Sequence, residues 1–144
     1  MTKHKRLHYS PRAFGILLIF AAILILAELK IRLQSSDKII SSLVRKNSSR
    51  TKKPFFLFNE SPTRLAFLLK TLELRLFGSS HCIRYALALS WLCQFLGLGS
   101  AIHIGVRRGR DNLLEAHTWI ESPSLAFQDL TAEKFQPLQR PDPS

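Results

Sequence analysis

Cysteine is scarce in this sequence, and its two cysteines are badly placed to pair. Cys82 and Cys93 are the only ones among 144 residues. On one helix they would lie roughly 16 Å apart along the axis, at ~1.5 Å per residue, whereas a disulfide needs its Cα atoms within ~7 Å. No C-x-x-C pair is present to hold a metal. The sequence therefore excludes a disulfide scaffold and favours a reducing, cytoplasmic compartment.

Phosphate-binding loops are lacking as well. The six glycines form neither a Walker-type loop nor a G-x-G-x-x-G turn, and the chain shows no internal repeat. No motif therefore predicts a bound cofactor or metal. With 46% hydrophobic residues, the chain has enough apolar side chains for one modest core.

Acidic residues are nearly missing from the front of the chain. Residues 1–54 hold twelve Lys and Arg against Glu28 and Asp37, whereas residues 55–144 hold nine against eight Asp and Glu. The net charge of +11 is thus almost entirely a property of the front. This asymmetry argues against a nucleic-acid partner and predicts a basic N-terminal region over 1–54 followed by a domain over 55–144.

The basic region contains one long apolar run, residues 13–27. Fifteen residues are few against the ~20 that span a bilayer, and no small-x-small cleavage site follows them. A helix packed against the rest of the fold is one interpretation, membrane association a second, and a cleaved signal a third. Residues 47–54, "NSSRTKKP", predict a linker.

Two amphipathic helices are predicted next. Ser61 and Pro62 open a helix whose apolar stripe contains Leu65, Leu68, Leu69, Leu72 and Leu76. The serines of "GSS", residues 78–80, are expected to cap a second helix that runs from about residue 81 to 96 and stops at Gly97.

Cys82 therefore falls in a first helical turn, where free N–H groups and the helix dipole favour a thiolate. This placement suits a nucleophile, although cysteine is also a common buried and inert residue. Cys93, three turns deeper among leucines, is predicted to be a core residue.

Alternating apolar residues predict strands at 101–107, 115–121 and 125–130. If the Ser-Pro-Ser turn at 122–124 joins the last two, His117 faces Asp129, with Cβ atoms ~5 Å apart. A carboxylate there would orient the imidazole. Cys82, His117 and Asp129 then form the set that nucleophilic cysteine catalysis needs. The alternative is a structural histidine and a turn aspartate.

The order of short motifs resembles a family, the B2-type lasso peptide biosynthesis proteins, which are transglutaminase-like leader peptidases. The resemblance rests on "HCIRYALALSWLCQFLGLGSAIHIGV", "EAHTWIES" and "FQDL". It implies an α+β, transglutaminase-like or papain-like cysteine peptidase core: a helix bearing the nucleophile packed on a small antiparallel sheet, preceded by an apolar helix. Residues 55–144 would be the catalytic domain. Cys82 would be the nucleophile, His117 the general acid/base and Asp129 the orienting acid, with Arg84 and Trp119 shaping the cleft.

The same resemblance implies a function and partners. The protein would remove the leader from a ribosomally made lasso precursor peptide in the cytoplasm, with peripheral membrane contact through its apolar helix. Its partners would be the precursor, a leader-binding B1-type protein and the lasso cyclase, in a maturation complex that uses ATP. Two alternatives remain open: an acyltransferase or deamidase with the same triad, and a non-catalytic membrane-associated binding protein.

Overall fold

The structure is a computed structural model that describes residues 11–35, 38–39, 61–125 and 134–138. These residues form three helices and a three-stranded antiparallel sheet: α1 (Pro11–Leu33), α3 (Pro62–Phe77), α4 (Cys82–Phe95), β1 (Ala101–Arg108), β2 (Leu114–Glu121) and β3 (Gln136–Pro137). The predicted α+β class, with a small antiparallel sheet and an apolar N-terminal helix, is confirmed in this coarse form.

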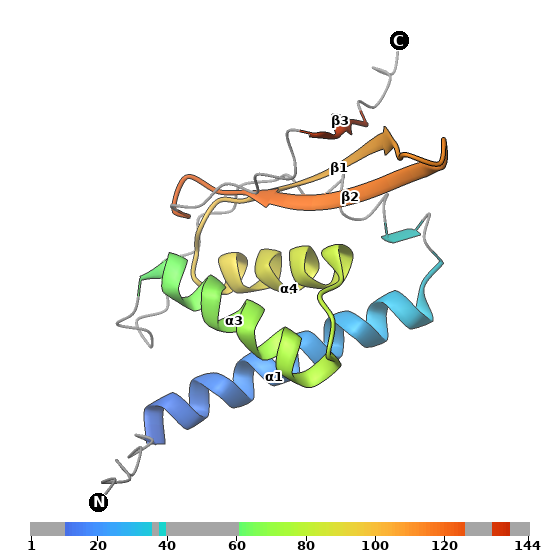
Figure 1. Ribbon diagram of the computed structural model, residues 1–144. Helices are drawn as coiled ribbons and strands as arrows, with labels where there is room; N and C mark the ends of the chain where they lie inside the picture. Colours follow the sequence, from blue (N-terminus) through green and yellow to red (C-terminus); the bar gives the residue numbers. More distant parts are fainter. Residues whose placement is uncertain (1–10, 36–37, 40–60, 126–133, 139–144) are drawn as a thin grey trace, which may run out of the picture.

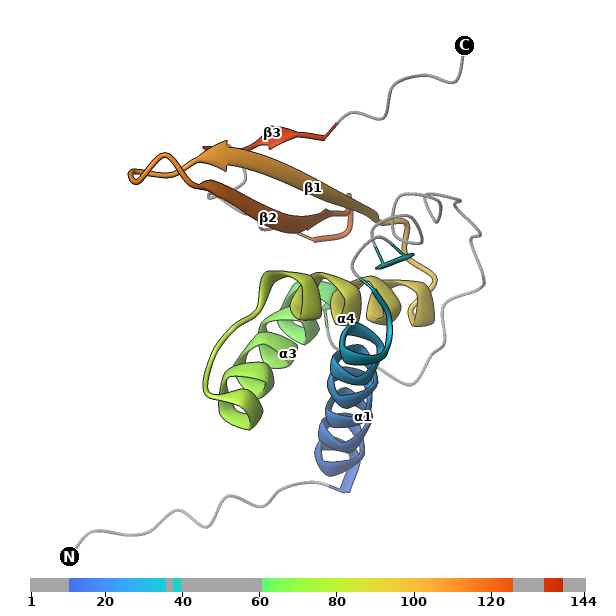
Figure 2. The same cartoon turned by 90° about the vertical axis from the view of Figure 1, so that its right-hand side faces the viewer.

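Helix α4 lies at the centre of the fold. In Figures 1 and 2 the sheet lies on one side of α4, and α1 and α3 lie on the other. Its buried residues point in nearly all directions, as expected of a helix with neighbours on both sides. The core cluster joins α4 to the other two helices and to the sheet, with members such as Leu24, Leu69, Leu89 and Ile120.

The boundaries of α3 follow its sequence signals. The Ser61 hydroxyl accepts the Arg64 N–H at 3.3 Å, and Gly78 ends the helix with φ +68°, a left-handed conformation that glycine adopts without strain. The predicted stripe is wrong at its last position, because Leu76 is exposed.

The start of α4 differs from the prediction. His81 is the N-cap residue and makes no side-chain capping hydrogen bond, so the serines before it do not cap the helix. The end matches better: α4 stops at Phe95, and Gly97 follows with φ +71°.

The sheet has the strand order β2-β1-β3. In the β1–β2 hairpin, Gly105 pairs with His117 and His103 with Trp119. After β2, the Leu125 N–H donates to the Ser122 carbonyl at 3.1 Å and closes a turn. Leu125 is in no strand, and the rest of the predicted strand 125–130, including Asp129, lies outside the described residues.

Helix α1 packs one narrow face on the core, through Phe20, Leu24 and Ala27. By length and composition it could cross a membrane, a test that signal sequences and buried core helices also pass. Only 17% of its most apolar stretch is buried in the protein, and Phe14 and Leu33 are exposed. The apolar surface of α1 is therefore larger than its packing on α3 and α4 requires. The predicted linker, residues 47–54, lies outside the described residues.

Candidate functional site

Cys82 is the first residue of α4, as the sequence predicts, and its side chain is half-buried. The first N–H groups of a helix have no partner within the helix and carry the positive end of its dipole. The thiol therefore lies at the N-terminal end of α4, where a reagent can reach it.

Cys93 has the opposite surroundings. It is 1% exposed in the core, and burial raises the pKa of its thiol to about 11. A thiol with that pKa is almost entirely protonated near neutral pH. The prediction that Cys93 is a core residue is confirmed, and Cys82 is the less buried of the two thiols.

The loop before Cys82 is held by a buried carboxylate from α3. Glu73 is fully buried, and its Oε1 accepts the His81 backbone N–H at 3.1 Å. Its Oε2 accepts the Ser80 hydroxyl at 3.0 Å and lies 3.4 Å from the Lys70 ammonium, which also contacts Ser80. A side chain from another helix thus accepts the backbone N–H of the residue directly before Cys82.

Arg84 completes this network from the first turn of α4. Its Nε donates to Glu73 Oε1 at 3.0 Å, its Nη1 to Glu28 Oε2 at 2.9 Å, and its Nη2 to the Ser79 carbonyl at 2.8 Å. The guanidinium also lies 3.9 Å from the centre of the Phe77 ring. These contacts hold three helices and the loop together. The predicted role of Arg84 in shaping a cleft stays a prediction.

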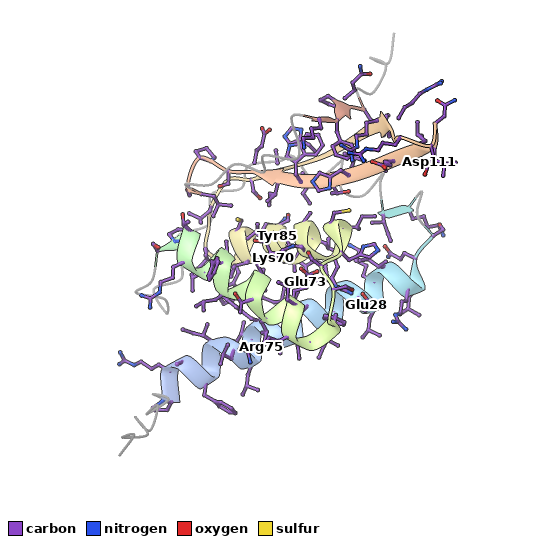
Figure 3. All side chains as sticks on the ribbon, viewed as in Figure 1. Glu28, Lys70, Glu73, Arg75, Tyr85 and Asp111 are labelled. Atoms are coloured by element: carbon purple, nitrogen blue, oxygen red, sulfur yellow. The ribbon has the colours of Figure 1, made fainter. Side chains whose placement is uncertain are left out.

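Glu28 connects α1 to the same network. Hydrogen bonds from Arg32 at 2.7 Å and from Arg84 hold the pKa of the Glu28 carboxyl below its ordinary value. In Figure 3, Glu28 and Glu73 lie where the three helices come together. We name the three side chains Glu28, Glu73 and Arg84 the carboxylate–arginine cluster.

On the sheet, His117 belongs to a row of packed rings. Its imidazole lies 6.1 Å from the Trp119 ring and 5.1 Å from Phe135, and Trp119 in turn stacks on His103 at 5.6 Å. The Trp119 indole N–H also donates to Glu121 Oε1 at 3.3 Å. The row restricts the orientation of the His117 ring, which is half-buried.

Gly105 has no Cβ, and this leaves room for the Trp119 and Phe135 side chains of the row. A Cβ at Gly105 would lie 2.9 Å from both Phe135 Cβ and Trp119 Cζ3, and 3.0 Å from the Gln136 carbonyl oxygen. These distances are shorter than real Cβ contacts. Glycine is therefore required opposite His117 for packing rather than for backbone conformation.

The structure brings two pairs of the predicted residues together. The His117 ring stacks on Trp119, and Arg84 lies two residues after Cys82 in the first turn of α4. Helix α4 packs on β2, the strand that carries His117.

Alternation along β2 puts His117 and Trp119 on one face and Ile120, a member of the core cluster, on the other. Asp129 lies outside the described residues. The Cys82, His117 and Asp129 triad therefore stays a prediction.

The sequence analysis missed Glu73 and Glu28. One signal for Glu73 was present in the sequence: it lies in the apolar stripe of α3, four residues after Leu69 and eight after Leu65. A charged side chain on a buried face needs a partner of opposite charge. Its partner, Arg84, is eleven residues away on the next helix, and only the helix–helix packing shows the pairing.

In the described part of the chain, no group of His, Cys, Asp or Glu side chains is arranged to hold a metal ion. The chain has two thiols, of which Cys82 is half-buried and Cys93 is buried. The described residues offer a thiol at the start of α4 and, on β2, an imidazole on the sheet face opposite the one that carries Ile120.

Comparison with known proteins agrees with this arrangement. The family model of the transglutaminase-like superfamily matches residues 23–140, which is most of the chain and begins within α1. No curated protein and no solved structure gives a match. The matched range contains Cys82, the β1–β2 hairpin and the second half of α1. The chain belongs to the transglutaminase-like superfamily.

Proposed function

We propose that the protein is a cysteine peptidase that removes the leader from a ribosomally made lasso precursor peptide. One observation carries the proposal: the superfamily match contains Cys82, placed half-buried at the first residue of α4. The superfamily includes cysteine peptidases and acyltransferases, and both begin with attack by a thiolate. The resemblance of the "HCIR" and "EAHTWIES" motifs to leader peptidases favours hydrolysis.

The proposed reaction has two steps. The Cys82 thiolate attacks the scissile carbonyl, the C–N bond breaks, and His117 gives a proton to the leaving amine. Water then attacks the thioester, His117 takes its proton, and the acid product leaves with Cys82 free again. Asp129 is proposed to accept the imidazole N–H and fix its tautomer, and Trp119 to hold the ring through stacking.

Product analysis of the precursor peptide tests this proposal. Wild-type protein, Cys82→Ala and Cys93→Ser are incubated with precursor, with and without hydroxylamine. We expect a free leader carboxylate from wild type and Cys93→Ser, and no product from Cys82→Ala. A hydroxamate or an amine adduct without hydrolysis would assign acyl transfer instead, and full turnover by Cys82→Ala would show that the thiol is not used.

We further propose that cleavage needs a leader-binding B1-type partner in a complex with the lasso cyclase that consumes ATP. The described residues are taken up by the core and the hairpin, and none forms a separate peptide-binding domain. The measurement is kcat/KM at sub-saturating precursor with and without the partner. We expect a large gain when the partner is added, and equal rates would reject the split arrangement.

We propose a cytoplasmic protein that touches the membrane surface through α1. The exposed apolar residues of α1 and the basic side chains Arg12, Lys30 and Arg32 support this. High salt or carbonate should release the protein from membranes. Resistance to both, with a terminus open to protease outside the cell, would show a spanning helix.

A further inference from the structure

We infer that Glu73 is a positioning residue for the nucleophile, acting through the backbone of His81 and the side chain of Ser80. The inference rests on the proposed function, in which Cys82 reacts with acyl groups. It adds a residue on a different helix, α3, whose carboxylate contacts both residues that precede Cys82.

The hydrogen bonds of Glu73 go to the loop directly before the nucleophile. Oε1 accepts the N–H of His81, the residue directly before Cys82, and Oε2 accepts the hydroxyl of Ser80. The carbonyl of Ser79 is held at 2.8 Å by Arg84, which is itself fixed by Glu73. Three consecutive residues before the thiol are therefore tied to one buried carboxylate.

The start of α4 has no local side-chain cap. His81 is the N-cap of α4 and makes no side-chain capping bond, so the helix start lacks the usual local anchor. Glu73 supplies an anchor from outside, and because the carboxylate is fully buried, water cannot replace it there. The orientation of the first turn of α4, which carries Cys82, then depends on Glu73.

This positioning role differs from simple stabilisation of the fold. Every buried residue of α3 contributes to stability, but among them Glu73 has the side chain that hydrogen-bonds to the loop before the nucleophile. Leu69 lies one turn earlier on α3, is also fully buried, and belongs to the core cluster. Leu69→Val is therefore a control that weakens the same helix without touching the loop.

The test uses p-nitrophenyl acetate with the full chain. Acylation forms the Cys82 Sγ–acetyl bond, breaks the ester C–O bond and releases p-nitrophenolate, and the thiol proton passes to solvent. The burst rate is followed by absorbance, and peptide mapping confirms that the acetyl group is on Cys82. Thermal unfolding of each variant ensures that rates are compared among folded proteins.

Glu73→Leu keeps the volume and removes every acceptor, and we expect it to slow Cys82 acylation by about tenfold or more, the scale of one charged hydrogen bond. Glu73→Gln keeps an oxygen for the His81 N–H and should recover to within about threefold of wild type. Leu69→Val should lower the thermal midpoint and leave the acylation rate unchanged. If Glu73→Leu does not fold, Ser80→Ala removes one donor from an exposed residue and should slow acylation by about threefold.

The inference is overturned if folded Glu73→Leu, or Ser80→Ala in its place, reacts at the wild-type rate, or if Leu69→Val slows acylation equally. Failure of the proposed function has a different signature. In that case wild type shows no burst, or its burst survives in Cys82→Ala, whatever residue stands at position 73.

Discussion

Replacement of Arg84 by methionine tests the carboxylate–arginine cluster most severely. The Arg84 side chain is 6% exposed and its guanidinium donates to Glu73, Glu28 and Ser79. Methionine fills much of the volume but leaves the Glu73 carboxylate buried without its main counter-charge. Removing one partner of a buried ion pair costs about 3–5 kcal/mol.

The lower end of this range applies here. Glu73 keeps Lys70 at 3.4 Å and the donors of Ser80 and His81, and Glu28 keeps Arg32 and is partly solvated. We therefore expect Arg84→Met to lower the free energy of unfolding by about 3 kcal/mol. At about 2–4 °C per kcal/mol for a chain near this size, the thermal midpoint should fall by roughly 10 °C.

The double variant Glu73→Leu with Arg84→Met is the matched control. It replaces the pair by apolar side chains, so no buried charge is left without a partner, and its stability should return to within about 1 kcal/mol of wild type. Urea unfolding of the three proteins measures both values. Wild-type stability in Arg84→Met, or a double variant as unstable as the single one, would refute the reasoning. Because the double variant lacks Glu73, it should regain stability and still acylate slowly.

Three further outcomes follow from single residues. Gly105→Ala should lower the free energy of unfolding by about 1–3 kcal/mol in thermal unfolding, because the new Cβ collides with Trp119, whereas Gly15→Ala, with nothing within 4 Å, should be neutral or stabilising. Glu28→Gln should lower stability at pH 7 by about 1–2 kcal/mol. Since the folded pKa of Glu28 is lowered, its contribution exists above the unfolded value of 4.5 and is lost as the pH falls through the folded pKa, so urea midpoints of Glu28→Gln and wild type should converge in acid. Cys93→Ser should lower the free energy of unfolding by about 1–3 kcal/mol. It should leave acylation of Cys82 unchanged, because the Cys93 thiol has a pKa of about 11 and stays protonated near neutral pH.

Much of the fold could be predicted from local signals. Ser61 with Pro62, and Gly78 and Gly97 with positive φ, set the helix ends within a residue or two, because these residues have backbone preferences that tertiary contacts do not change. Strands β1 and β2 followed from alternation of apolar side chains.

What depends on packing between elements could not be predicted. The serines of the "GSS" loop were expected to cap α4, but Ser80 donates instead to a carboxylate on α3. Nothing in the local sequence says that Glu73 will lie beside His81, because the angle between α3 and α4 decides it. The stacking of His103 on Trp119 likewise requires the β1–β2 register.

The candidate site shows the same division. Cys82 at the helix start was predictable from the glycine and serines before it, and it is found there. The relation of His117 to the thiol depends on how the sheet is placed over α4, and its relation to Asp129 depends on a residue that lies outside the described residues. These two pairings therefore stay predictions of sequence and resemblance.

The most direct measurement is intact-mass detection of an acyl-enzyme on the full chain during turnover of the precursor peptide. We expect a thioester on Cys82 in wild type and none in Cys82→Ala. We expect the intermediate to form about 10³ times more slowly in His117→Gln and about 10⁴ times more slowly in Asp129→Asn, as in the protease template. An acyl-enzyme on another residue, or wild-type rates in both His117→Gln and Asp129→Asn, would contradict the account.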